Sequence, residues 1–412
     1  MYGIFHLTSV PKLNALILRY IFRYAQLIGV IFFCLRKSKD GERVSNCKWI
    51  KWIGITHRIV TFCIFIYSYF LAIILTSQPA AKVLHVFRLL LSIPIVALIL
   101  GYTLRGPEII ELFNQFLQLF RQVRNLFKPK PNGFGGGREL ILIMLNLICL
   151  FHELTYIWVA EKHFSWYFWI FWWCDVSVVT GTNMFIHLNC MAYLSIGVLY
   201  SEVNKYVRTH LGTQLQKMNT ATDEKEIRRA HNRLEKCIHL YKEIYNISTT
   251  FQRIFVLPLF LAMINKVLLI TSLGLRMILD LEYSSLIFLL LMVKHILDLF
   301  LLTISVQGAL NQFWIIRRSN LEIGEAGKLR NFQRTVSQLL CSKLFEYFLV
   351  VFLSLQLEIF FTHLNIYQFR VSILGLCEIS NQLFLKFLSA LTCWLAFIAQ
   401  YRMQIRNVYQ NT

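Results

Sequence analysis

The chain has 412 residues, of which 56% are hydrophobic and only 16% are charged, and its mean hydropathy is +0.53. This composition excludes a soluble globular protein and indicates a chain that crosses a membrane several times. The formal net charge of +20 does not indicate nucleic-acid binding, because the Lys and Arg residues lie between long apolar runs and form no single basic stripe.

Apolar runs long enough to cross a hydrocarbon core of about 30 Å predict seven transmembrane helices. They cover residues 53–75, 83–104, 139–160, 167–196, 254–275, 284–308 and 384–405. The apolar runs 13–35 and 344–362 contain central charges that cost about 2.5–3.5 kcal/mol each to insert, so we predict non-spanning helices there. Residues 221–247 are charged and helical in pattern, which predicts a helix that extends beyond the bilayer and packs on a partner. The apolar stripe of this helix comprises Ile227, Leu234, Ile238 and Tyr241.

The basic residues predict the orientation of the chain. Of the 42 Lys and Arg residues, 33 lie in the segments 1–51, 105–138, 201–253 and 311–386, and five lie in the segments on the opposite side. Because positive residues gather on the cytoplasmic side, the N-terminus is predicted to be cytoplasmic. Seven crossings then place the C-terminus outside.

Ionisable residues inside the spans are the candidate functional residues, since a charge in lipid is costly and by default faces a bundle interior or a wet cavity. Lys294 and Asp298 lie four residues apart on one face of the sixth span, which predicts either a structural ion pair or a ligand or gating site. Asp175 lies among aromatic residues of the fourth span and requires a partner or a ligand.

The outer halves of the spans contribute further side chains to an expected outward-facing pocket. These residues are His85, Arg88, His152, Tyr156, Trp158 and Lys266. Aromatic faces with a few polar groups suit a small organic ligand. The alternative for the aromatic residues is a place in the interfacial belt of the membrane.

Motifs of enzymes are not found. The sequence contains no HExxH, GxSxG or phosphate-loop motif, so neither an enzymatic activity nor a cofactor or metal is expected. The stretch Gly135-Gly136-Gly137 is predicted to be a flexible loop. Two other seven-span functions remain as alternatives. A G-protein-coupled receptor requires an extracellular N-terminus, which the charge bias opposes, and a secondary transporter is disfavoured because no internal repeat is found.

The stretch CWLAFIAQY (393–401) resembles a motif of the insect gustatory receptors. In the seventh span of that family, Thr-Tyr is followed by five hydrophobic residues, Gln and usually Phe. Gln400 is identical to the Gln of the motif, and Tyr401 takes the place of Phe. Upstream, Gly375-Leu376 resembles the Gly-Leu-Phe element of the family, and LSLQLE (353–358) resembles the cytoplasmic helix that precedes it. The N-terminal segment is similar to that of bitter-type members.

The resemblance implies a ligand-gated, non-selective cation channel, a homo- or heterotetramer in which each subunit contributes its seventh helix to a central pore. The ligand is then a small-molecule tastant, a bitter or noxious compound, and the location is the plasma membrane of sensory neurons. On the predicted pore stripe, the candidate pore and gate residues are Cys393, Phe397, Gln400 and Tyr401. The alternative for Gln400 is a hydrogen bond between helices.

Together, the spans and the resemblance predict an all-α seven-transmembrane-helix bundle in four parts. These are a cytoplasmic N-terminal segment with an amphipathic helix (1–52), a six-helix ligand-binding bundle that includes the cytoplasmic loop 201–253 (53–310), a cytoplasmic anchor region (311–383), and the pore-lining seventh helix with an extracellular tail (384–412). The expected partners are the tastant, other receptor subunits, the lipid bilayer and permeant cations, and not nucleic acid.

Overall fold

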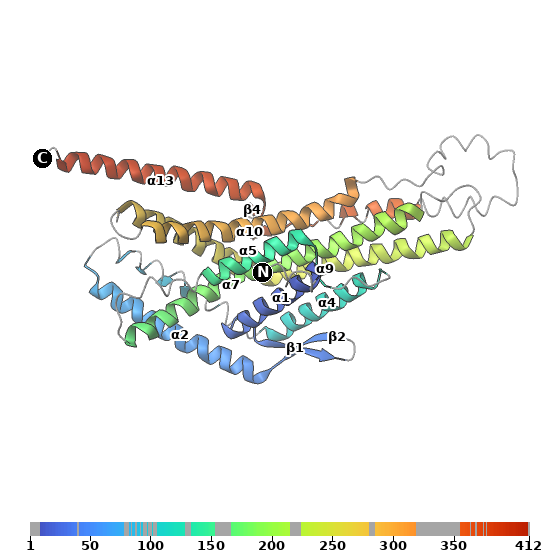
Figure 1. Ribbon diagram of the computed structural model, residues 1–412, viewed down its shortest axis with the longest axis horizontal. Helices are drawn as coiled ribbons and strands as arrows, with labels where there is room; N and C mark the ends of the chain where they lie inside the picture. Colours follow the sequence, from blue (N-terminus) through green and yellow to red (C-terminus); the bar gives the residue numbers. More distant parts are fainter. Residues whose placement is uncertain are drawn as a thin grey trace.

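The computed structural model describes most of the chain as long helices that run side by side (Figure 1). The described residues are 9–38, 41–77, 105–127, 133–152, 166–214, 224–279, 285–318, 355–362, 364–366, 369–373, 375 and 377–410, with single residues and pairs between 82 and 101. The named elements in chain order are α1 (Val10–Leu27), β1 (Phe33–Ser38), β2 (Gly41–Asn46), α2 (Lys48–Leu75), α4 (Gly106–Arg124), α5 (Gly137–His152), α7 (Trp166–Tyr206), η2 (Val207–Gly212), α9 (Glu224–Leu279), α10 (Ser285–Arg318), β3 (Ser372–Ile373), β4 (Cys377–Glu378) and α13 (Asn381–Gln410).

Five of the described helices are long and apolar enough to cross a membrane. They correspond to the first, fourth, fifth, sixth and seventh predicted spans, and lie in α2, α7, α9, α10 and α13. The third predicted span is described only as far as His152, and the second only in fragments. The predicted helical bundle is confirmed, with two small antiparallel hairpins added, β1 with β2 and β3 with β4.

The segment 201–253, predicted as a cytoplasmic loop, consists largely of extensions of two transmembrane helices. α7 continues into η2, and α9 is one unbroken helix that contains both the predicted loop helix and the fifth span. No Gly or Pro occurs between Glu224 and Leu257 to end the helix. Three residues of the predicted stripe pack on the same chain, because Leu234 and Tyr241 are buried and Ile238 lies against the core; the side chain of Ile227 lies outside the described residues.

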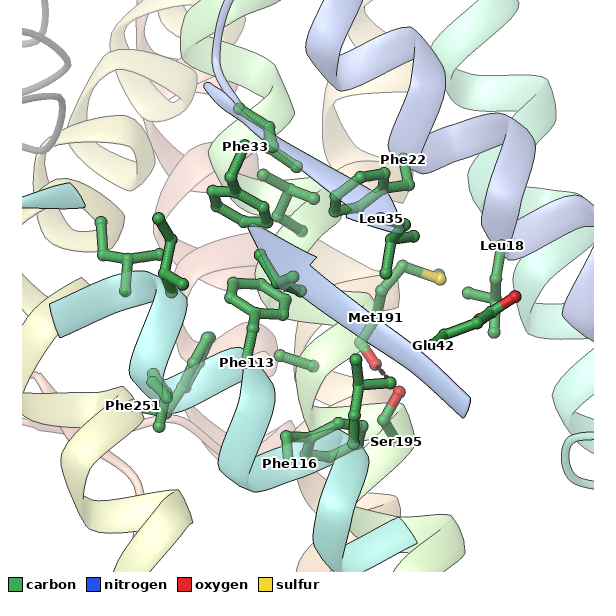
Figure 2. Close-up of a pocket in the computed structure, with 18 of the residues that line it drawn as sticks. Leu18, Phe22, Phe33, Leu35, Glu42, Phe113, Phe116, Met191, Ser195 and Phe251 are labelled. Carbon is green, nitrogen blue, oxygen red and sulfur yellow. Dashed lines mark hydrogen bonds between the residues drawn. The ribbon is translucent and has the colours of Figure 1, made fainter. Parts of the chain in front are cut away.

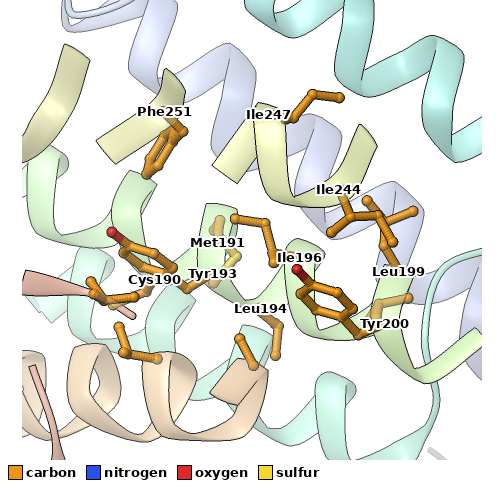
Figure 3. Close-up of a cluster of buried hydrophobic side chains, with 14 of the residues drawn as sticks. Cys190, Met191, Tyr193, Leu194, Ile196, Leu199, Tyr200, Ile244, Ile247 and Phe251 are labelled. Carbon is orange, nitrogen blue, oxygen red and sulfur yellow. The ribbon is translucent and has the colours of Figure 1, made fainter. Parts of the chain in front are cut away.

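Aromatic side chains lie among the buried residues of the core, with Tyr193 and Tyr200 on α7 and Phe251 on α9 (Figure 3). The ring of Tyr200 on α7 lies 5.8 Å from that of Tyr241 on α9 and 5.4 Å from that of Phe313 on α10, between centroids. Rings at these separations pack favourably beyond their buried area. α7 is therefore the central helix around which the other two are packed.

Small and polar residues hold α7 close to α10. A Cβ atom at Gly197 would lie 3.3 Å from Cα of Ala309, so the two backbones approach closely. The Asn204 amide donates to the backbone oxygen of Gln312 over 2.5 Å and accepts a hydrogen bond from the Tyr241 hydroxyl. These contacts connect α7, α9 and α10 at the end of the bundle where α7 and α9 extend.

The glycine-rich stretch predicted as a flexible loop is docked on α1. Gly133 has φ +111°, and a Cβ atom there would lie 2.1 Å from the backbone of Pro11. The Phe134 N–H donates to the Pro11 oxygen over 2.8 Å. The Asn14 amide donates to the oxygens of Phe134 and Gly136, over 2.8 and 3.1 Å. The close approach and the positive φ both require glycine at position 133.

The segment between α10 and α13 is described only in its second half, which packs on the extended part of α9. The Phe360 ring lies 5.7 Å from that of Tyr241, and the Gln252 amide donates to the backbone oxygen of Arg370 over 2.9 Å. Gly375, part of the stretch that resembles the family element, has φ +71° between β3 and β4. The chain then enters α13, which lies along one edge of the bundle (Figure 1).

Candidate functional site

Three of the predicted functional residues meet inside the bundle. Lys294 Nζ lies 2.8 Å from Asp298 Oδ2, and Lys266 Nζ of α9 also binds this oxygen. All three side chains are buried, and Asp298 is 0% exposed. The predicted i,i+4 ion pair on α10 therefore exists, and Lys266, which was predicted only to line a pocket, is its third member.

Polar residues from two further helices complete what we call the buried charge cluster. Its members are Asn146, His187, Lys266, Lys294, His295 and Asp298. His187 Nε2 of α7 lies 3.8 Å from Asp298 Oδ1, and His187 Nδ1 lies 2.7 Å from Asn146 Oδ1 of α5. α5, α7, α9 and α10 therefore all contribute to the cluster. Asn146 and His187 were not among the predicted functional residues, although each is a polar residue inside an apolar run, which is the pattern that could have identified them.

The contact between Lys266 and His295 determines the protonation of the imidazole. Lys266 Nζ lies 2.8 Å from His295 Nδ1. An ammonium group has only donors, so Nδ1 is the acceptor and His295 is neutral. One carboxylate, that of Asp298, consequently faces two ammonium groups within the cluster.

The distribution of apolar and polar residues on α10 explains why Lys294 and Asp298 point into the bundle. Apolar Val293, Leu297 and Phe300 are exposed on one side of the helix, while Lys294 and Asp298 are buried on the other. Because every member of the cluster is buried, the cluster is a closed polar core and not an open pocket. A polar ligand could enter only if the helices moved apart.

The remaining predicted pocket residues are only partly described. His85 lies against Tyr69 of α2, with ring centroids 5.7 Å apart, and His152 is half-buried at the described end of α5. Arg88, Tyr156 and Trp158 lie outside the described residues, as does the side chain of Asp175. The expectation that these residues line one outward-facing pocket stays a prediction.

α13 packs on its own subunit along one side. The Phe384 ring lies 5.2 Å from that of Phe300 on α10. Leu395 occupies the space beside Gly274 of α9, where a Cβ atom would lie 2.4 Å from Leu395 Cδ2. These two contacts join α13 to α10 and α9 of its own subunit.

The other side of α13 is exposed and carries the candidate pore residues. Between Asn381 and Gln400, where the structure describes every side chain, only that of Leu391 is buried. Cys393, Phe397 and Gln400 are exposed, Phe397 by 66%. The side chain of the fourth candidate pore residue, Tyr401, lies outside the described residues.

Comparisons with known proteins assign the chain to a family. The model of the 7tm chemosensory receptor family matches residues 18–405. A Drosophila melanogaster protein named as gustatory receptor 92a is 53% identical over 409 residues, which cover 99% of this chain and all of that protein. Gustatory receptor 93b of the same organism is 33% identical over 409 residues, 97% of this chain and 96% of the relative.

A solved structure shares the fold. The olfactory receptor OR5 of the insect Machilis hrabei, determined in complex with eugenol, aligns with a TM-score of 0.56 at 12% sequence identity. The alignment covers 94% of this chain and 99% of that receptor. The helical bundle, the family match over residues 18–405 and the full-length relatives lead to one conclusion: this chain is a multi-pass membrane protein of the insect gustatory receptor family.

Proposed function

We propose that the protein is a subunit of a ligand-gated, non-selective cation channel that detects small-molecule tastants, bitter or noxious compounds, at the plasma membrane of sensory neurons. The observation that carries the proposal is the exposed side of α13. A long apolar helix that packs on its own subunit along only one side has a second side free for partner subunits or a pore. Cys393, Phe397 and Gln400 lie on that second side, as a pore stripe requires.

Four copies of α13 would place these residues in rings around a central pore. A ring of Gln400 amides offers donors and acceptors to a hydrated cation without a fixed charge, so ion selectivity would be weak. A ring of Phe397 side chains would narrow the pore and close it by dewetting. The tetramer contains either four copies of this chain or this chain with other gustatory receptor subunits.

Ligand binding opens the pore only if the ligand binds the open state more tightly than the closed state. The proposed ligand site lies in the outward-facing half of the bundle, with the N-terminus in the cytoplasm. Movement of α9 and α10 would reach α13 through the contacts of Gly274 with Leu395 and of Phe300 with Phe384. The buried charge cluster connects the same two helices and would keep them in register.

The test is to express the full chain in a heterologous cell, alone and with candidate partner subunits, and to record currents during application of a panel of bitter compounds. Gln400→Ala and Phe397→Ala should change unitary conductance or basal leak while surface expression persists. Ile398→Ala, on the half-buried side of the same helical turn, is the matched control and should leave conductance unchanged. Wild-type currents from both pore variants would refute the proposed pore stripe.

Orientation has its own test. An epitope tag at each terminus is stained on intact and on permeabilised cells. The proposal expects the N-terminal tag to be detected only after permeabilisation and the C-terminal tag on intact cells. An N-terminal tag detected on intact cells would support the G-protein-coupled receptor topology instead.

A further inference from the structure

A large apolar cavity lies beneath the β1–β2 hairpin. It has a volume of about 620 Å³ and is enclosed by α1, the β1–β2 hairpin, α4 and the middle parts of α7 and α9 (Figure 2). Phe22, Phe33, Phe113 and Phe116 surround it, and Met191 lies on its α7 side. Among the described residues of the buried charge cluster and of the predicted outward pocket, none lines it.

The interior of this cavity suits a hydrocarbon chain. The Ser195 hydroxyl donates to the Met191 oxygen and the Asn189 amide donates to the Phe185 oxygen, each over 2.7 Å, so the hydroxyl and one amide N–H are used within α7. The remaining interior wall is largely aromatic and aliphatic. Cavities of about 300–1,000 Å³ with such walls hold ligands that bury most of their apolar surface.

The rim of the cavity is basic. Arg19, Lys51, Arg121 and Arg124 line it, and the described part of the rim contains a single acidic residue, Glu42. Arg19 binds the Glu42 carboxylate, and Arg121 donates to the Glu42 backbone oxygen. The Lys51 backbone N–H donates to the Cys47 oxygen over 3.0 Å, but its ammonium group makes no ion pair or hydrogen bond with a described residue, so this group is available to an anion.

Neighbouring residues place this rim at the surface of the membrane. Trp49 and Trp52, on either side of Lys51 at the start of α2, are 80% and 66% exposed. Exposed Trp residues at the end of a transmembrane helix are typical of the headgroup layer. α1 beside it exposes Leu16 and Tyr20 while Ile17 is buried in the core, as in a helix that lies in the interface.

We propose that the cavity binds an acyl chain of an anionic phospholipid whose headgroup lies against Lys51 and Arg121. The proposed cytoplasmic N-terminus places the rim in the leaflet that carries the anionic lipids, so the charges are complementary. Such a lipid joins α1 and the hairpin to α7 and α9. Receptor function would then depend on the lipid composition of that leaflet, through a site separate from that of the tastant.

The experiment uses the full-length receptor purified in detergent. Phosphatidylserine, phosphatidylcholine or oleic acid is added to it, and both phospholipids carry palmitoyl and oleoyl chains. Native mass spectrometry measures the lipid bound per subunit. Phosphatidylserine should bind most strongly. Lys51→Gln should weaken its binding about fivefold, the effect of one basic residue near an anionic surface. Lys48→Gln is the matched control, since Lys48 is exposed one turn earlier on α2 and does not line the cavity, and it should change nothing.

A second pair of variants tests the cavity itself. Ala192→Phe fills it from α7 and should abolish phosphatidylserine binding, whereas Ala192→Ser leaves the volume open and should retain it. Should Ala192→Phe fail to fold, phosphatidylserine with a photoreactive acyl chain still tests the site on the wild-type receptor. Its label is expected on α4 near Phe113 and Phe116 or on α7 near Met191.

Four results would overturn the proposal. The first is an equal loss of phosphatidylserine binding from Lys51→Gln and Lys48→Gln, which would indicate general attraction to the protein surface. The second is binding of phosphatidylcholine as strong as that of phosphatidylserine, and the third is saturation of the cavity by oleic acid with no phospholipid bound. The fourth is photolabelling confined to other helices. None of these readouts requires channel activity, so they are independent of the test of the proposed function.

Discussion

Asp298→Asn tests whether one carboxylate neutralises the buried charge cluster. The substitution keeps the size of the side chain but leaves the ammonium groups of Lys266 and Lys294 facing a neutral amide, in a site where Asp298 is 0% exposed. Removing one partner of a buried ion pair costs about 3–5 kcal/mol, because a buried charge is left uncompensated. We expect a loss of this size, seen as a fall in Tm of about 5 °C or more.

The cluster holds two ammonium groups and one carboxylate, so removing a positive charge should cost less than removing the negative charge. Lys294→Met leaves Lys266 and Asp298 as a one-to-one pair, so its cost should be well below that of Asp298→Asn. Combining Asp298→Asn with Lys266→Met and Lys294→Met removes all three charges and should recover part of the stability.

The assay is thermal unfolding of the full-length receptor, fused to a fluorescent protein and followed by size-exclusion chromatography in detergent. Surface expression of the same variants in cells is measured in parallel. An Asp298→Asn variant that unfolds at the wild-type temperature and reaches the surface normally would show that this carboxylate does not neutralise the cluster. A larger loss of stability from Lys294→Met than from Asp298→Asn would show the same.

Three further predictions concern the contacts that hold the helices together. Gly133→Ala should lower the free energy of unfolding by at least about 1–3 kcal/mol, because the new Cβ atom would lie 2.1 Å from the α1 backbone and φ is +111°. Gly137 is surrounded by open space, so Gly137→Ala should be close to neutral in the same thermal assay. Asn114→Ala should lower the free energy of unfolding by about 1–3 kcal/mol, since the Asn114 amide binds both the N–H and the carbonyl of Val44. Limited proteolysis should then cut the β1–β2 hairpin faster than in wild type, and an unchanged rate of cleavage would contradict this prediction. Gly274→Leu should displace α13 and shift basal current while the buried charge cluster stays intact, and a wild-type current–voltage relation would show that this contact does not couple the bundle to the pore helix.

The sequence predicted those features that depend on local patterns. Apolar length identified the spans in α2, α7, α9, α10 and α13, because a helix in lipid must be continuous and apolar over a fixed distance. The spacing of Lys294 and Asp298 predicted their ion pair, since residues four apart share a helix face. The motif around Gln400 led to the family that the full-length relatives show.

Features built from distant segments were not predictable in the same way. Lys266 is 32 residues from Asp298 in the chain, and nothing in the local pattern of either helix says that the two meet. The loop beside Gly133 was predicted to be flexible. The residue that binds it, Asn14 of α1, lies 120 residues away in the chain, so no local pattern shows the contact. The cavity under the hairpin likewise needs α1, α4, α7 and α9 together.

Local periodicity, length and motif in the sequence were therefore enough to predict the five described helices that are long and apolar enough to cross a membrane, and the family of the chain. The three-dimensional packing was needed to show which buried charges share a counter-ion, which side of α13 is exposed, and where a cavity remains. Those properties depend on how the helices pack against one another, and the packing is set by contacts between side chains far apart in the chain.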